Sequence, residues 1–131
     1  MKVMALDFGS ARTGVAVSDP TGLIARPLCV VEKAASDAGL EELERLVAEE
    51  APETVVVGHP LTLRGERGDQ AHETEQFAKK LRTRLDVPVV LFDERFTTDL
   101  AQQTQADAAE DARAAAHLLS SYLAWSSAAP A

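Results

Sequence analysis

Apolar and polar positions alternate in short runs over the first quarter of the chain. Three runs have the pattern of strands, namely Lys2–Phe8, Gly14–Ser18 and Leu23–Glu32. The turns between them are rich in Gly, Ser and Pro. Short apolar runs joined by such turns predict a three-strand antiparallel meander. Pro27 interrupts the third run, so we expect that strand to bend there and to lie at a sheet edge.

From about residue 38 the pattern changes to alternating helices and strands. Ala38–Glu50 and Gln70–Leu85 carry apolar residues at helical spacing, and Asp111–Trp125 reads as a last, Ala-rich helix. Between them, Thr54–Val57 and Val87–Phe92 are almost continuously apolar, as expected of parallel strands buried on both faces. The chain is therefore predicted to be α/β, with a mixed five-stranded sheet (a three-strand meander plus two parallel strands) and helices on both faces.

The overall composition is that of one globular domain. The chain has 131 residues, of which 46% are hydrophobic and 26% charged, so we expect a single domain over residues 1–125 and a frayed tail over 126–131. No run approaches the roughly 20 apolar residues of a membrane span. The single Cys29 and the absence of a signal-peptide pattern favour a cytoplasmic location and no membrane partner.

Acidic residues stand where the predicted strands end. Asp7 closes the first strand, Asp93 and Glu94 close the last, and Asp111 opens the final helix. In sheets of this type, ligands collect at the carboxyl ends of the strands. Adjacent strand residues point to opposite faces, so only one of Asp93 and Glu94 is expected to reach the same place as Asp7. A simpler interpretation of Asp7 is that it accepts hydrogen bonds from the turn amides of Gly9 and Ser10.

Three acids that converge in this way need a cation. Like charges that lie close together cannot all stay ionised without one. Ligands that are all oxygen favour a hard ion, so the pattern predicts Mg²⁺ or Mn²⁺. Two such ions about 4 Å apart are suited to phosphodiester hydrolysis, because they activate a water and stabilise the leaving oxygen.

Other polar residues have two interpretations each. The planar guanidinium of Arg12 suits a phosphate, but a surface ion pair of little energetic value is the alternative. His59 is more often structural than catalytic at a strand end, and the basic run Lys79–Arg84 is either a solvated helix face or a surface that steers a polyanion. Tyr122 and Trp125 are either packing residues or part of a homodimer contact.

Four segments in order resemble the motifs of a known family: Asp7–Asp19, Val56–Leu61 with Gly65, Asp93–Thr98, and Asp111–Ala115. Together they resemble the YqgF/RuvX family, described as Holliday-junction resolvases and as nucleases that trim precursor ribosomal RNA. The resemblance covers nearly the whole chain and implies a ribonuclease-H-like fold. It also implies that Asp7, Glu94 and Asp111 take the metal-binding catalytic places, and it decides for Glu94 over Asp93.

Two departures from the family pattern affect nucleic-acid binding. The family usually carries a longer segment, rich in Lys and Arg, between the third and fourth motifs, whereas residues 96–110 are short and acidic here. His59 stands where the family usually has an apolar residue. The net charge of −8 also speaks against non-specific nucleic-acid binding. We therefore expect binding to depend on Arg12, Arg64 and Arg95, although Arg95 is equally suited to pairing with Asp93.

The sequence thus predicts a metal-dependent endonuclease that acts on structured nucleic acid, either branched DNA or precursor 16S rRNA. Its expected catalytic and metal-binding residues are Asp7, Glu94 and Asp111, with Asp93 and His59 as accessory residues. Two alternatives stay open. One is a nucleotide-binding module, because the first motif also resembles the phosphate loop of actin-like ATPases. The other is a nucleic-acid-binding module of the same fold with vestigial acids.

Overall fold

The computed structural model describes residues 1–61, 68–94 and 108–128. The elements in chain order are β1 (Val3–Asp7), β2 (Arg12–Ser18), β3 (Ala25–Glu32), α1 (Asp37–Glu50), β4 (Thr54–His59), α2 (Asp69–Arg84), β5 (Val89–Asp93) and α3 (Ala108–Ala128). They correspond to the predicted elements with boundaries shifted by a few residues. From the sequence alone, Thr97 or Thr98 could also cap a further helix, to about Ala108. Residues 95–107, which include that start, and Arg64 lie outside the described residues.

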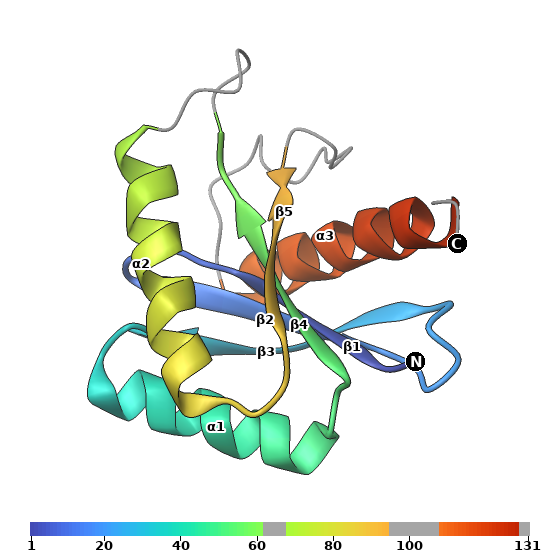
Figure 1. The fold of residues 1–131 in the computed structure, drawn as a ribbon, viewed down its shortest axis with the longest axis horizontal. Coiled ribbons are helices and arrows are strands. Elements are labelled where there is room, and N and C mark those ends of the chain that lie inside the picture. The colour runs from blue at the N-terminus through green and yellow to red at the C-terminus, as the bar shows by residue number, and fades with distance from the viewer. Residues whose placement is uncertain (62–67, 95–107, 129–131) are drawn as a thin grey trace.

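The strands form one five-stranded mixed sheet in the order β3-β2-β1-β4-β5 (Figure 1). β1, β2 and β3 pair antiparallel, whereas β4 pairs parallel with both β1 and β5. The prediction of a meander plus two parallel strands is confirmed. β3 is an edge strand, and its register against β2 shifts beside Pro27, as the proline predicted.

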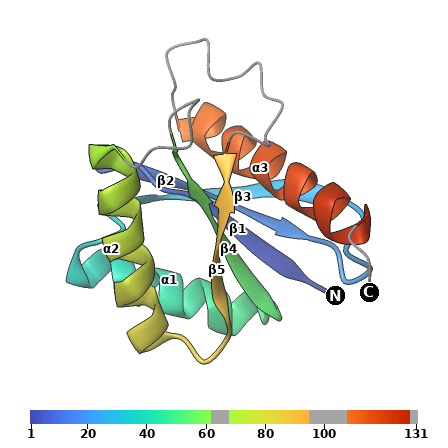
Figure 2. The ribbon, with the colours of Figure 1, turned by 45° about the horizontal axis from the view of Figure 1, so that its top comes forward.

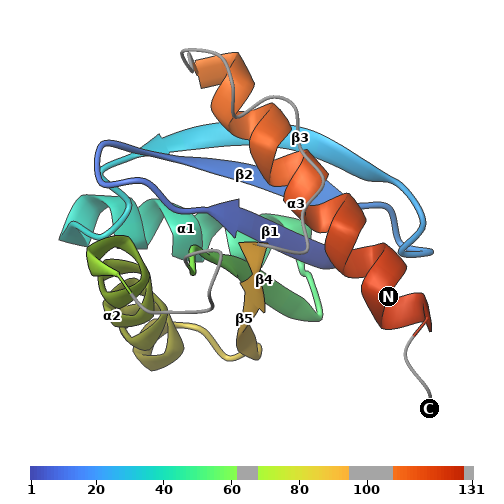
Figure 3. The same ribbon diagram turned by 90° about the horizontal axis from the view of Figure 1, so that it is seen from above.

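Helices cover both faces of this sheet. Figure 3 shows α3 crossing over β1, β2 and β3, with α1 and α2 on the opposite face. Alternation along β1 divides the core accordingly, because Met4 and Leu6 join the cluster under α1 and α2, whereas Val3 and Ala5 join the cluster under α3. The face of the sheet on which a strand residue lies can therefore be read from its position in this alternation.

α3 differs from its predicted bounds at both ends. It begins at Ala108, so Asp111 lies within the first turn of the helix and not at its first residue. It ends at Ala128, three residues beyond the expected end at Trp125, so the first half of the predicted tail is helical. Alanine has the highest helix propensity of any residue, which accounts for the extension at the N-terminal end. None of the helices in the described ranges is long and apolar enough to cross a membrane.

Candidate active site at the carboxyl ends of the parallel strands

The carboxyl ends of β1, β4 and β5 lie at one edge of the sheet, because these three strands run parallel. Figure 2 shows this edge beside the N-terminal end of α2. Asp7 is the last residue of β1 and is half-buried. By alternation it shares the α3 face of the sheet with Val3 and Ala5, and Gly14 of β2 lies directly opposite it. Asp7 is therefore the first acid at this edge.

Glu94 reaches Asp7 across a gap that a glycine leaves in β4. β4 lies between β1 and β5, and a β-carbon built on Gly58 would lie 2.5 Å from Oε1 of Glu94. The missing side chain thus gives Glu94 room to cross β4. Asp93 pairs in register with His59, one position back along the strand. The structure therefore brings Glu94, and not Asp93, against Asp7.

Burial and the proximity of Asp7 raise the proton affinity of Glu94. Burial raises the pKa of Glu94 from 4.5 to about 8, and the negative charge of Asp7, a hydrogen bond to the Asp7 side chain and the charge of Asp93 add to the effect. At neutral pH the pair therefore holds one proton between two carboxyl groups. A divalent cation would replace that proton and neutralise both acids.

Asp111 lies at the same edge but is turned toward a different partner. A β-carbon on Gly14 would lie 1.9 Å from the backbone oxygen of Asp111, so this glycine lets the first turn of α3 pack directly on β2, opposite Asp7. The Asp111 carboxylate, however, pairs with Arg12, with 2.8 Å between Oδ2 and Nε. Asp111 is thus beside the Asp7–Glu94 pair in the fold, while its charge is directed to Arg12.

The donor set fits a hard divalent cation, although its third member is engaged elsewhere. All three acids offer oxygen only, and two of them already share a proton. Among the described residues, no three His, Cys, Asp or Glu side chains are placed to hold one metal ion together. The arrangement therefore comprises a converged pair, Asp7 and Glu94, and a third acid that Arg12 neutralises.

A pocket of about 210 Å³ opens in front of the converged pair. Asp7 and Glu94 form one wall, the turn residues Gly9 and Ser10 another, and Gln70, Glu73, Thr74 and Pro60 the rest. Sequence reasoning missed Gln70 and Glu73, because it considered only the apolar positions and the basic run of this helix. The chain order could have predicted both residues. Because α2 follows β4, the first turns of α2 lie at the carboxyl edge of the sheet.

The turn after β1 uses Thr13 as a hydrogen-bond acceptor. The Gly9 amide donates to the hydroxyl oxygen of Thr13 at 3.4 Å. A β-carbon on Gly9 would lie 2.5 Å from the Arg12 backbone oxygen, which explains the glycine in this tight turn. Asp7, which precedes this turn, lines the pocket and contacts Glu94.

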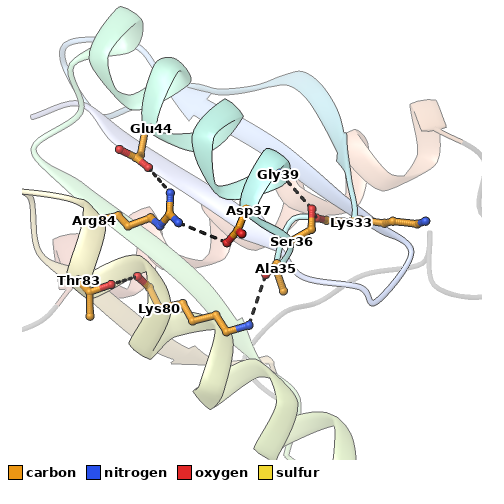
Figure 4. A network of polar contacts seen from close by, with 9 residues as sticks. All are labelled: Lys33, Ala35, Ser36, Asp37, Gly39, Glu44, Lys80, Thr83 and Arg84. Atoms are coloured by element: carbon orange, nitrogen blue, oxygen red, sulfur yellow. Dashed lines mark hydrogen bonds and ion pairs between the residues drawn. The ribbon is translucent and has the colours of Figure 1, made fainter.

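His59 and the basic run of α2 take part in packing contacts. Nε2 of His59 lies 2.7 Å from Oε2 of Glu75 on α2, a pairing that ties the end of β4 to that helix. In Figure 4, Arg84 reaches Glu44 and Asp37 of α1, and Lys80 reaches a backbone oxygen before α1. These contacts join the two helices on one face of the sheet.

The aromatic residues near the end of α3 pack against β5. Phe92 meets Tyr122 edge-on at 5.5 Å and Trp125 at 5.7 Å between ring centroids. The prediction of a packing role is confirmed for both residues of α3, although Trp125 is 53% exposed. The homodimer stays a prediction. Arg64 and Arg95, the other expected nucleic-acid contacts, lie outside the described residues.

The sheet order and the helices on both faces of the sheet define a ribonuclease-H-like fold. Solved structures share it. *Thermus thermophilus* RuvC in complex with a Holliday junction substrate aligns with a TM-score of 0.64 at 17% identity, over 98% of this chain and 96% of that chain. A second structure of *Thermus thermophilus* RuvC gives a TM-score of 0.59 at 18% identity. Structural similarity at 17% and 18% sequence identity establishes the fold alone.

Sequence comparison identifies the family. The profile of the RuvX family, described as Holliday junction resolvase, matches residues 1–125, and the chain belongs to this family of nucleases. A relative from *Geobacillus kaustophilus*, named "Putative pre-16S rRNA nuclease", is 39% identical over 94% of this chain and 97% of that protein. A relative of the same name from *Chloroflexus aurantiacus* is 45% identical over 77% of this chain, a match that spans 66% of the relative. The resemblance seen in the four motifs is thereby confirmed.

Proposed function

We propose that this chain is a divalent-metal-dependent endonuclease that hydrolyses phosphodiester bonds in structured nucleic acid in the cytoplasm. The observation that carries the proposal is the contact between Asp7 and Glu94 in a pocket at the carboxyl edge of the sheet. Two half-buried acids in contact are costly unless a proton or a cation compensates them. Family membership gives this arrangement a function, since the family consists of nucleases.

Asp7, Glu94 and Asp111 are the residues proposed to hold Mg²⁺ or Mn²⁺, as a site for two ions. When bound, such ions activate a water and stabilise the leaving oxygen of a phosphodiester. Glu94 must lose its proton before it can act as a ligand, so occupancy is linked to pH. Asp93, which raises the pKa of Glu94 by its charge, is proposed as an accessory residue, and His59 as a support for the end of β4.

The proposed path of the nucleic-acid backbone runs along the same edge. Arg12 begins β2, two residues after the pocket-lining turn residue Ser10, and its side chain is 38% exposed, so its guanidinium is accessible to a phosphate. Arg64 and Arg95 are proposed as further phosphate contacts from their positions in the sequence. The proposed substrate is branched DNA or precursor 16S rRNA. The family description names the first type of substrate, and the name of the relatives gives the second.

Cleavage assays with three substrates side by side test the proposal. A Holliday junction, a precursor 16S rRNA fragment and ATP are each incubated with the protein in Mg²⁺, in Mn²⁺ and in EDTA. We expect one or both nucleic acids to be cut at internal positions with either ion, and no cleavage in EDTA. Full cleavage in EDTA would refute the metal assignment. Hydrolysis of ATP alone would favour the nucleotide-binding module, and tight binding without cleavage would favour the module with vestigial acids.

A further inference from the structure

Arg12 and Asp111 form an ion pair between the start of β2 and the first turn of α3. Nε of Arg12 lies 2.8 Å from Oδ2 of Asp111, and the Asp111 side chain is only 19% exposed. Oδ2 itself is buried, and within the described part of the chain it accepts no hydrogen bond of regular geometry. A carboxylate oxygen withdrawn from water in this way needs a positive charge nearby, and Arg12 supplies it.

The backbone of Asp111 is fixed, whereas its carboxylate has a choice of partners. Packing on Gly14 holds the backbone oxygen of Asp111 against β2, and Gly14 stands opposite Asp7 in the sheet. The backbone of Asp111 therefore lies beside the Asp7–Glu94 pair, whereas its side chain faces Arg12. This geometry accounts for the finding that no three described acids are placed to hold one metal ion.

We propose that Arg12 is a counter-ion that withholds Asp111 from the metal site in the free protein and releases it when a substrate phosphate takes its place. This inference rests on the proposed function. The guanidinium fork suits a phosphate oxygen at least as well as a carboxylate. Once Arg12 binds a phosphate, Asp111 needs a new cation, and a divalent ion held by Asp7 and Glu94 would supply that charge.

The exchange makes metal binding and substrate binding cooperative. A phosphate that draws Arg12 away raises the affinity of the three acids for a divalent ion, and by linkage the ion raises the affinity for the nucleic acid. The metal site is then completed only when a substrate backbone is in place. Arg12 is a positioning residue in this scheme, because it acts through Asp111.

A double-mutant cycle on metal affinity tests the exchange without any cleavage assay. Free Mn²⁺ is measured by electron paramagnetic resonance in titrations of the wild type, R12Q, D111N and R12Q/D111N, with no nucleic acid present. We expect R12Q to bind Mn²⁺ about five-fold or more tightly than the wild type, a typical size for a coupling between sites. That gain should disappear in the D111N background, because the gain depends on a freed Asp111.

A matched control separates this effect from general electrostatics. Arg113 lies on the same turn of α3 and pairs with Glu110 at 3.3 Å, so R113Q removes one positive charge near the helix start without touching Asp111. R113Q should bind Mn²⁺ as the wild type does. Melting curves confirm that each variant folds, and if R12Q does not fold, R12K should show a smaller gain in the same direction.

The substrate arm of the experiment uses a Holliday junction with phosphorothioate linkages, corrected for the Mn²⁺ that the junction binds alone. The junction should raise the Mn²⁺ affinity of the wild type and add little to that of R12Q. Equal Mn²⁺ affinities for R12Q and the wild type would overturn the exchange, as would an equal gain in the D111N background. If D7N and E94Q bind Mn²⁺ as tightly as the wild type, the proposed metal nuclease itself is wrong.

Discussion

Glu94 reaches Asp7 only because residue 58 has no side chain. A β-carbon on Gly58 would lie 2.5 Å from Oε1 and 3.0 Å from both Cγ and Cδ of Glu94. β4 separates the strands that carry the two acids, so any side chain on this face of β4 would stand between them. The contact between Asp7 and Glu94 therefore requires a glycine at position 58 as well as the two acids.

Replacing Gly58 by Ala should damage the site while sparing the fold. The added methyl group displaces the end of a flexible side chain, so the melting temperature should change little. Separation from Asp7 should lower the pKa of Glu94, and Mn²⁺ affinity should fall about ten-fold or more, the usual cost of disturbing the support of a metal ligand. Melting curves and a Mn²⁺ titration measure the two effects separately.

Gly14→Ala is the matched control for this prediction. Its β-carbon would lie 1.9 Å from the backbone oxygen of Asp111, and a helix backbone cannot move aside as a side chain can. We expect Gly14→Ala to cost about 1–3 kcal/mol or more of unfolding free energy, as overpacking does. Equal loss of stability in the two variants would mean that Glu94 is held rigidly, contrary to the prediction.

The stability of the metal-free protein should fall as pH rises from about 5 to above 8. Between pH 4.5 and about 8, the folded protein keeps a proton on Glu94 that the unfolded chain has lost, because the pKa is raised on folding. The folded state binds more protons in this range, so the free energy of unfolding declines with pH and levels off above the folded pKa. Each unit of difference between the two pKa values corresponds to about 1.4 kcal/mol.

Chemical denaturation in EDTA at several pH values measures this slope. Glu94→Gln removes the titrating group, so the decline attributed to Glu94 should disappear in that variant. Excess Mg²⁺ should also flatten the curve for the wild type, because the ion takes the place of the proton. An unchanged slope in Glu94→Gln would show that Glu94 titrates normally in the folded protein.

The fold could be read from the sequence because its signals are local. Hydrophobic alternation, turn residues and Pro27 fixed the strands, the meander and the edge position of β3. The bounds of α3 were less accessible, because Ala-rich flanks extend a helix without any marked start or stop signal. Sequence position alone placed Asp111 at a helix start, whereas the structure places it within the first turn.

The site could be predicted only as a set of residues, because their partners depend on packing between distant segments. Alternation shows that Asp93 and Glu94 face opposite sides, but only the gap at Gly58 shows which of them can reach Asp7. The pairing of Asp111 with Arg12 depends in the same way on the close approach of α3 at Gly14. Neither glycine carries a chemical group that would mark it in the sequence.

Arg12→Ala should weaken nucleic-acid binding uniformly across sequences. A phosphate contact carries no base information, so the loss should be similar for all junctions, and the slope of log affinity against log salt should fall by about one. Fluorescence anisotropy at several salt concentrations in EDTA measures both. Arg45→Ala is the control, because Arg45 is also exposed but pairs with Glu42 and Glu49 on α1.

An unchanged affinity and salt slope in Arg12→Ala would mean that nucleic acid does not approach this edge. Arg64→Ala, which changes a residue between β4 and α2 in the sequence, is expected to behave as Arg12→Ala does if the nucleic-acid backbone follows the edge of the sheet. If Arg12→Ala has no effect, the next candidate to test is Lys79, an exposed residue of the basic run on α2. The other basic residues of that run, Lys80, Arg82 and Arg84, make the contacts that join α2 to its neighbours.

Asp7→Asn should separate the destabilising effect of the Asp7 charge from the role of Asp7 in metal binding and cleavage. Asparagine keeps the size and most of the hydrogen bonding of Asp7 but removes its charge. The metal-free variant should therefore melt higher than the metal-free wild type, and more so above pH 8, where Glu94 is also ionised. Cleavage should be almost completely lost. Mg²⁺ should raise the melting temperature of the wild type by mass action and that of the variant much less.

Asp19→Asn is the control for this last prediction, because Asp19 has the turn-capping role that was the simpler interpretation of Asp7. Its carboxylate accepts hydrogen bonds from the amides of Leu23 and Ile24 at 2.9 and 3.0 Å. The bond from the Ile24 amide and that from the Thr21 hydroxyl lower the pKa of Asp19 to about 2. Asp19→Asn should therefore melt lower than the wild type and respond to Mg²⁺ as the wild type does. If Asp7→Asn behaves like Asp19→Asn, Asp7 is structural and the metal site is refuted.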